Sequence, residues 1–380
     1  MKQPKGILGE LLFYTAFLSF CIKFTLDYSG LIPVRPEMFN NLLVGISITC
    51  SMVKVVFQRY TFSRFLVTMA ICAVIGFSSM ISINFLFLLS FLLLMGMQDI
   101  KLESIVKLAL FVKIVSIAVH VFWYIVVFHT NPDVIQFVFR AGVGAPRHFF
   151  FMGHANTFMA FLVWSCIDYI YLRYNKLTVL DMAVIWLINI IFYSFAFSNT
   201  GIIVMAIVTL LIALDKLGKG FFDKLFTWLA KYLYLLFSII FSTLVIFYTR
   251  LDGQLLVMWH GLDDFLTGRL WLGAHAYDIF GHTILGRPDM PPTVAFWQGR
   301  YFNTMTVFDN HYVGNLVSYG IINTVALVIV LVKLCGKMEN REKLVIIAFS
   351  FFAIMQSDVT NVVICFALLL IGKYLYRSKT

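Results

Sequence analysis

Long apolar runs separated by short polar segments make up most of this chain. Runs near 20 residues, the length that crosses roughly 30 Å of hydrocarbon at about 1.5 Å per residue, recur from one end to the other. Twelve can be distinguished, at 9–27, 38–57, 64–81, 83–98, 105–128, 150–172, 178–197, 201–215, 229–249, 310–333, 344–356 and 358–375. The pattern predicts an all-α integral membrane protein, a polytopic bundle of about 12 transmembrane helices.

Two connections are longer than the others, 129–149 and 250–309. The second is rich in aromatic residues, which is untypical of a disordered linker. Apolar residues from Leu262 to Phe280 recur at helical spacing and predict one amphipathic helix lying on the membrane surface, ended by Gly286 and Pro288. Without a visible internal repeat, the chain is expected to form a single polytopic domain over 1–380.

The composition supports the membrane assignment, and the placement of basic residues adds an orientation. The chain is 61% apolar and 13% charged, against roughly 45 to 50% and about 25% in soluble domains. Alternate connections are basic, and they carry Arg59, Arg64, Lys101, Lys107, Arg173, Lys176, Lys216, Lys219, Lys224, Lys333, Lys337, Arg341, Lys343, Lys373, Arg377 and Lys379. The connections between them hold no lysine. Basic loops remain cytoplasmic, so both termini are expected inside and 250–309 outside.

The same distribution accounts for the net charge of +10 without a nucleic-acid partner. None of the six cysteines falls in an outer connection, and none has metal-ligand spacing. A set of acidic residues and histidines in 250–309 could in principle hold a divalent cation, namely Asp263, Asp264, His275, Asp278 and His282. Their spacing matches no known metal motif, so neither a metal nor another cofactor is expected. Within the apolar runs, Lys23 and Asp27 are expected to pair, and Lys113 has no evident explanation.

Polar residues gather at the expected outer ends of the spans. They are His154 and Asn156 before the sixth span, Ser198, Asn199 and Thr200 between the seventh and eighth, Asp309, Asn310 and His311 before the tenth, and Asp358 and Asn361 at the last. Polar groups at membrane depth are costly and usually line a cavity. The alternative, that Ser, Asn and Asp merely cap helices, is open for several of them.

Seven arginines form a second set on the same side: Arg35, Arg140, Arg147, Arg250, Arg269, Arg287 and Arg300. The planar guanidinium suits bidentate contact with phosphate and keeps its charge in a dry site. The set therefore favours a phosphate or pyrophosphate ligand. Contact with lipid headgroups is the alternative.

Four segments resemble, in order and spacing, the superfamily of Wzy-type repeat-unit polymerases and O-antigen ligases. They are Gly153-His154-Ala155-Asn156; Ser198-Asn199-Thr200-Gly201; Thr267-Gly268-Arg269-Leu270-Trp271 with Ile284-Leu285-Gly286; and Asp309-Asn310-His311-Tyr312-Val313 with Tyr319-Gly320-Ile321-Ile322. The resemblance covers residues 150–325. The first five spans share only topology.

The resemblance implies a multi-pass glycosyltransferase of the bacterial plasma (inner) membrane. It would transfer a growing glycan, of capsule, exopolysaccharide or O-antigen, from undecaprenyl pyrophosphate to the non-reducing end of a lipid-linked repeat unit on the outer face. Implied partners are the undecaprenyl-pyrophosphate-linked oligosaccharide and the lipid bilayer, with a flippase and a chain-length regulator beside them. A ligase-like transferase and a lipid-linked oligosaccharide flippase or transporter are the alternatives.

One departure bears on the general base. Ligases of this superfamily carry histidine eleven residues ahead of a glycine; counting back from Gly320 gives Asp309, with His311 two residues later. Aspartate at this position is familiar among the polymerases that this chain resembles, so the departure favours a polymerase over a ligase. Either Asp309 or His311 could act as the base. Arg269 is expected to stabilise the departing pyrophosphate. Substrate binding is expected from His154, Asn156, Asn310, Arg140, Arg147, Arg287 and Arg300.

Overall fold

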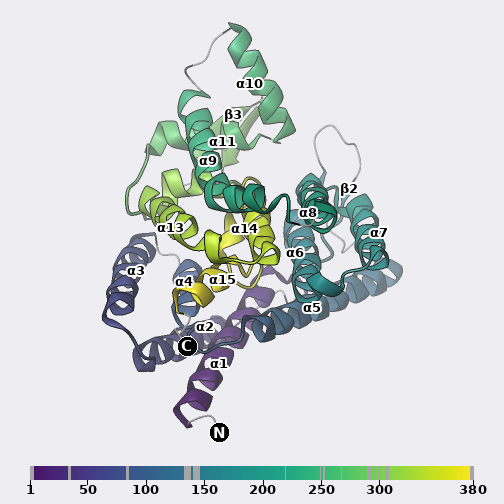
Figure 1. Ribbon diagram of the computed structural model, residues 1–380. Helices are drawn as coiled ribbons and strands as arrows, with labels where there is room; N and C mark the ends of the chain where they lie inside the picture. Colours follow the sequence, from purple (N-terminus) through teal and green to yellow (C-terminus); the bar gives the residue numbers. More distant parts are fainter. Residues whose placement is uncertain are drawn as a thin grey trace. The chain divides into compact units, whose positions relative to one another are not determined.

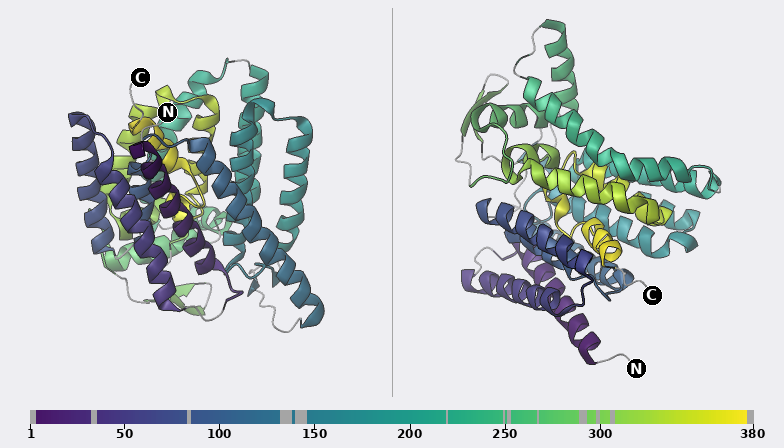
Figure 2. Two further views of the ribbon diagram at one scale, coloured as in Figure 1. Left: turned by 90° about the horizontal axis from the view of Figure 1, so that it is seen from below. Right: turned by 60° about the vertical axis from the view of Figure 1, so that its left-hand side comes forward.

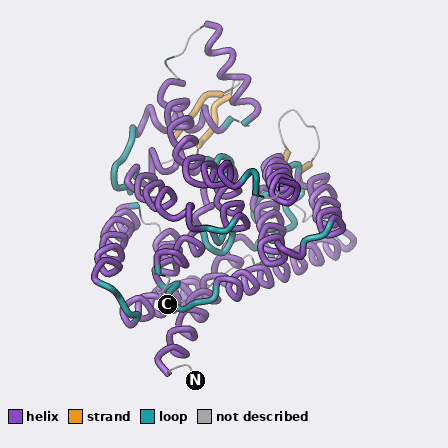
Figure 3. The backbone as a smooth tube through the Cα atoms, in the orientation of Figure 1, coloured by secondary structure: helices purple, strands orange, loops and turns teal. Residues whose placement is uncertain are grey.

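Helices make up most of the described structure, and the strands form two short ribbons (Figures 1 and 3). The computed structural model describes residues 4–32, 36–82, 85–131, 138–139, 146–218, 220–248, 250, 253–266, 268–288, 293–297, 300–304 and 308–376. The longer helices are α1(Pro4–Tyr28), α2(Glu37–Phe57), α3(Phe62–Ile81), α4(Phe85–Met95), α5(Leu102–Thr130), α6(Ala155–Arg173), α7(Val179–Ala196), α8(Asn199–Gly218), α9(Asp223–Tyr248), α10(Gly253–Phe265), α11(Arg269–Phe280), α13(Ile321–Leu334), α14(Asn340–Phe352) and α15(Ala367–Leu375). The short turns are η2(Tyr174–Lys176), α12(His311–Gly314), the π-helical η3(Asn315–Tyr319), η4(Cys335–Lys337) and η5(Ser357–Thr360).

Both ribbons are antiparallel. β1(Val138–Phe139) pairs with β2(Pro146–Arg147), and β3(Thr293–Trp297) pairs with β4(Arg300–Thr304). The second ribbon lies within the connection 250–309, which the sequence predicted to be only partly helical.

Eight helices in the described part of the chain are long and apolar enough to cross a membrane: α1, α2, α3, α5, α6 with η2, α7, α8 and α9. Each coincides with one of the predicted spans. They coincide because a chain in lipid must satisfy its backbone internally, so a long apolar run has to be helical. The helical fold is thereby confirmed, and the length and composition of these eight helices support a multi-pass membrane protein.

The other four predicted spans do not form single helices of membrane length. The run 83–98 holds α4, of 11 residues; 344–356 and 358–375 hold α14 and α15, of 13 and 9 residues. The run 310–333 is divided at Gly320, where φ is 102°. A count of twelve spans therefore stays a prediction.

The chain divides into two compact units. Unit 1 comprises 1–59, 92–222 and 362–380, and unit 2 comprises 60–91 and 223–361. Each unit is assembled from separate stretches of the chain, and these stretches alternate along the sequence. The expectation of one polytopic domain therefore stays a prediction.

In unit 1, α1 pairs with α2, and α6 packs against α5, α7 and α8 (Figures 1 and 2). The side chains of α6 are largely buried, and its Asp168 lies 2.6 Å from the ammonium of Lys113 on α5. Lys113 also donates to the Ile364 carbonyl at 3.0 Å. Lys113 is therefore one half of a buried ion pair. The expected pair of Lys23 and Asp27 is confirmed.

In unit 2, α9 is the central helix and packs against α11, α12, α13 and α14. Aromatic rings fill the contact, with Tyr234 stacked on Phe349 and Phe241 on Tyr312. Ser78 links α3 to η3 and α13, because its hydroxyl donates to the Tyr319 carbonyl at 2.7 Å and accepts from the side-chain nitrogen of Asn323 at 3.0 Å.

The expected single helix from Leu262 to Phe280 is wrong. The structure has two helices, α10 ending at Phe265 and α11 beginning at Arg269, because Gly268 adopts φ 80° and Asp263 binds N–H groups in the first turn of α11. α11 then ends before Gly281 at φ 66°, earlier than the predicted end at Gly286.

Candidate active site

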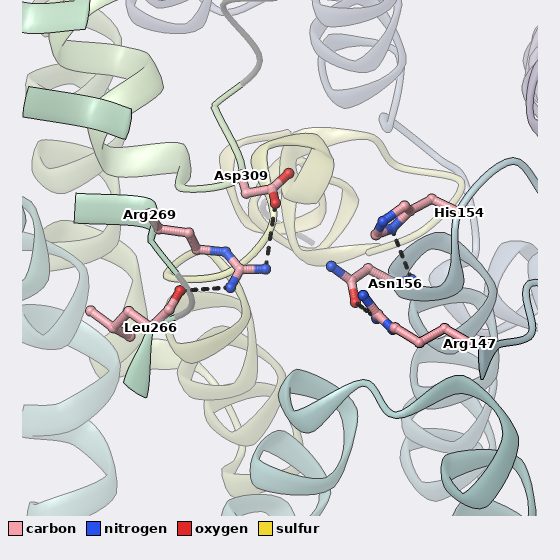
Figure 4. Close-up of polar contacts among 6 residues, drawn as sticks. All are labelled: Arg147, His154, Asn156, Leu266, Arg269 and Asp309. Atoms are coloured by element: carbon pink, nitrogen blue, oxygen red, sulfur yellow. Dashed lines mark hydrogen bonds and ion pairs between the residues drawn. The ribbon is translucent and has the colours of Figure 1, made fainter. Parts of the chain in front are cut away.

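His154, Asn156 and Arg147 form a polar cluster in unit 1, at the start of α6 (Figure 4). Gly153 takes φ 64°, and the extended His154 that follows is the N-cap of the helix, its Nδ1 accepting from the Asn156 N–H at 3.2 Å. Both residues lie in the first turn of α6, as expected, and the outer position of that turn stays a prediction. His154 is exposed, whereas Asn156 is half-buried.

Arg147 reaches this turn from β2. Its Nε donates to the Ala196 carbonyl at the end of α7 at 2.9 Å, and a terminal nitrogen donates to Asn156 Oδ1 at 2.9 Å (Figure 4). The guanidinium is nearly buried. A cation held in this way by two fixed acceptors is oriented before any ligand arrives, which favours binding of an anion.

In unit 2, Arg269 and Asp309 form an ion pair (Figure 4). Arg269, the first residue of α11, donates to the Leu266 carbonyl at 2.8 Å and places its other terminal nitrogen 3.5 Å from Asp309 Oδ2. The Arg269 side chain is 8% exposed and the Asp309 side chain 48%. The carboxylate therefore meets solvent, whereas the cation beside it is largely shielded.

Asn310 is committed to helix capping. Its Oδ1 accepts from the N–H groups of Tyr312 and Val313 at 3.0 and 3.2 Å, which starts α12. Its Nδ2 is buried and has no hydrogen-bond partner among the described residues. Capping thus accounts for the amide oxygen, and the expected contact of Asn310 with substrate stays a prediction.

His311 points into the helix packing. It is 2% exposed, and its Nε2 lies 3.1 Å from the side-chain nitrogen of Asn315, which also donates to the Tyr234 hydroxyl at 3.1 Å. A base must come within hydrogen-bond distance of the hydroxyl that it deprotonates. Asp309 meets that condition more readily than His311 does.

Three further arginines were expected to bind substrate: Arg287, Arg300 and Arg140. Arg287 donates to the carbonyls of Gly281 and His282 at 3.3 and 3.1 Å and lies over the Phe280 ring, so its guanidinium ties the end of α11 to the following loop. Burial lowers the pKa of Arg287. Arg300 begins β4, and Arg140 lies outside the described residues.

Two of the resembling segments pack directly on each other in unit 2. The Ile322 N–H donates to the Ile284 carbonyl at 3.1 Å, and the flanking Arg287 N–H donates to the Ser318 carbonyl at 3.0 Å. Gly320 leaves no room for a side chain: an added Cβ would lie 2.6 Å from the Ile284 carbonyl oxygen and 2.8 Å from Gly286 N. Contact between backbones explains the glycine at this position.

Comparisons with known proteins give no further guide. No protein-family model, curated protein or solved structure matches this chain. The residues themselves therefore carry the functional argument.

Two buried carboxylates have roles that the sequence did not predict. Asp168 neutralises Lys113, and Asp263 supports the turn before Arg269, with its pKa raised by burial. Within the described residues no group of three or more His, Cys, Asp or Glu is arranged to hold a metal ion. A lone aspartate inside a long apolar run was the available signal for Asp168, because such a charge needs a partner.

Proposed function

We propose that this protein is an oligosaccharide repeat-unit polymerase of the bacterial plasma membrane. It moves a growing glycan from undecaprenyl pyrophosphate to the non-reducing end of a lipid-linked repeat unit on the outer face. The observation that carries the proposal is the pairing of a shielded Arg269 with an accessible Asp309 in one compact unit. The four resembling segments add support.

The chemistry assigns each of these two groups one task. The acceptor hydroxyl loses its proton to Asp309 while its oxygen forms a bond to the anomeric carbon of the donor glycan. The bond from that carbon to the pyrophosphate oxygen breaks, and the negative charge left on pyrophosphate is stabilised by Arg269. A guanidinium suits the leaving group because it presents paired N–H donors and keeps its charge when shielded from water.

The proposal includes several features beyond the reaction. Arg147, His154 and Asn156 bind phosphate or sugar hydroxyls, and Asn310 contributes its amide nitrogen. The chain crosses the membrane twelve times with both termini in the cytoplasm. A flippase delivers the lipid-linked unit, and a chain-length regulator acts on the product.

Two other functions share part of this chemistry. A ligase would use the same donor and leaving group with a different acceptor. A transporter of lipid-linked oligosaccharide has one observation in its favour, the buried pair of Lys113 and Asp168, because charges inside the membrane often mark a transport pathway. The pair is compact and neutral overall, which equally suits a structural role.

Reconstitution separates the three functions. Lipid-linked repeat units are extracted from a host strain deleted for this gene and incubated with the purified protein in nanodiscs. A polymerase yields a ladder of longer lipid-linked glycans and releases undecaprenyl pyrophosphate. Heat-treated protein is the control. Unchanged single units would count against the polymerase, and movement of intact units across liposome membranes would favour a transporter.

A further inference from the structure

A buried carboxylate closes the turn that leads into α11. Asp263 is 2% exposed. Its Oδ1 accepts the N–H of Leu270 at 2.8 Å, and both oxygens lie 3.3 Å from the N–H of Trp271. Its own backbone carbonyl accepts the Gly268 N–H at 2.9 Å. One residue therefore fixes both sides of the turn, through its main chain and its side chain.

The same carboxylate also holds a third helix. The Tyr248 hydroxyl, at the end of α9, donates to Asp263 Oδ2 at 3.1 Å and lies 3.1 Å from Nδ1 of His260 on α10. α9 packs along α11 as well. The ends of α9, α10 and α11 are thus joined at a single buried anion.

Arg269 lies between the two residues that Asp263 holds. Gly268 before it binds the Asp263 carbonyl, and Leu270 after it binds the carboxylate. The Arg269 guanidinium donates back to Leu266 within the same turn. A negative charge at the first turn of a helix is favourable, because free N–H groups and the helix dipole attract it. The position of the arginine therefore depends on the aspartate.

We propose that Asp263 is a positioning residue for Arg269, setting the start of α11 so that the guanidinium is held ready for the pyrophosphate of the substrate. The identity of that ligand rests on the proposed function; the dependence of Arg269 on Asp263 does not. Asp263 itself touches no substrate. It accepts the N–H groups at the start of α11, which leaves anion binding there to the side chain of Arg269.

The variant Asp263→Asn keeps the shape of the side chain and changes only its charge and its hydrogen-bonding groups. One carboxylate oxygen becomes an NH₂ group, which cannot accept from the donors that face it, and the charge at the helix start disappears. A displacement near 1 Å at a positioned group can cost about a hundredfold in rate. Asp264→Asn is the matched control, because Asp264 is the exposed neighbour on the same helix.

The test measures binding of inorganic pyrophosphate to the full-length protein in nanodiscs by calorimetry, for the wild type, Asp263→Asn, Asp264→Asn, Arg269→Lys and the double variant Asp263→Asn/Arg269→Lys. We expect Asp263→Asn to weaken binding roughly tenfold or more and Asp264→Asn to leave it unchanged. In the Arg269→Lys background, Asp263→Asn should add little, because two residues acting through one contact are not additive. Should Asp263→Asn fail to fold, Tyr248→Phe removes one donor to the carboxylate and should weaken binding a few-fold.

The proposal would be overturned if Asp263→Asn weakened pyrophosphate binding by the same factor in the wild type and in the Arg269→Lys variant. Unchanged binding by the single variant Asp263→Asn would also overturn it. Absence of pyrophosphate binding by the wild type would overturn it too. Failure of the proposed function looks different: pyrophosphate binding that depends on both Arg269 and Asp263, in a protein that makes no polymer from lipid-linked units, would remove the polymerase and leave the positioning role intact.

Discussion

At the scale of single residues, three consecutive polar side chains have three different environments. Asp309 lies before the helix and is half-exposed, Asn310 caps α12, and His311 is buried against Asn315. The sequence located this group and left the base open between Asp309 and His311. It could not separate them, because the exposure of each depends on where α12 begins and on what packs against it.

The first prediction compares the two candidate bases. Asp309→Asn removes the proton acceptor while keeping the shape of the side chain, and should lower the polymerisation rate by roughly a hundred- to ten-thousand-fold. His311→Gln should cost less activity and appear mainly as a lower melting temperature, because it disturbs a buried hydrogen bond. Initial rates with lipid-linked repeat units and thermal unfolding of both purified variants provide the comparison. Near-normal turnover of Asp309→Asn beside an inactive His311→Gln would assign the base to the histidine.

The second prediction concerns the cation. Arg269→Lys keeps the charge and loses the planar pair of donors, so it should be nearly as damaging to polymerisation as Arg269→Ala. Polymer length in membranes containing equal amounts of each variant measures the effect. Arg173→Lys is a suitable control, because Arg173 is exposed at the end of α6, in a connection that the sequence predicts to be cytoplasmic. Full-length polymer from the lysine variant at 269 would show that any cation suffices there.

At the scale of elements, hydropathy predicted the long helices but missed the positions at which helices are interrupted. The eight long helices follow from apolar runs of sufficient length. The break between α10 and α11 depends on Asp263 binding N–H groups seven and eight residues further along. The break at Gly320 depends on contact with 284–286. Periodicity over a window of residues does not contain either contact, so both interruptions were missed.

The third prediction tests the backbone contact at Gly320. Gly320→Ala places a Cβ 2.6 Å from the Ile284 carbonyl oxygen at φ 102°. A strained backbone of this kind costs about 1 to 3 kcal/mol, and the overlap adds to it. Thermal unfolding of the purified variant should show the loss. Gly76→Ala is the matched control in the same unit, because an added Cβ on α3 meets nothing within 4 Å; an equal loss there would remove the packing argument.

At the scale of the whole molecule, the candidate residues are divided between two compact units. Arg147, His154 and Asn156 belong to unit 1, and Arg269 and Asp309 belong to unit 2. The sequence predicted the helical spans and the polar turns at their ends, because both follow from neighbouring residues. It did not pair Lys113 with Asp168, because hydropathy contains no information on which helix faces which.

The fourth prediction concerns that buried pair. Asp168→Asn leaves the Lys113 charge uncompensated and should destabilise the protein by roughly 3 to 5 kcal/mol, whereas Lys113→Met/Asp168→Leu should recover most of the loss. Unfolding in detergent measures stability, and polymerisation by the double variant measures function. A stable double variant with normal activity is the expected result for a structural pair. A stable but inactive one would point instead to a pathway through the membrane.

The last prediction fixes the orientation of the chain, on which an outer-face reaction depends. A single cysteine replaces Val257, on α10 within 250–309, or Phe221, within the lysine-rich connection 216–224. Both changes are made in a variant whose six native cysteines are replaced by serine. Both side chains are exposed. Because outer connections lack lysine and inner ones are basic, a membrane-impermeant thiol reagent should label position 257 in intact cells and leave position 221 unlabelled.

Permeabilised cells are the control for reactivity, and both positions should be labelled there to a similar extent. Labelling at 221 but not at 257 in sealed cells would place the basic connections outside. Arg269 and Asp309 lie in the chain between 257 and the next predicted span, so that result would put them on the cytoplasmic side. The flipped lipid-linked unit would then never meet them, and an outer-face polymerase would be excluded.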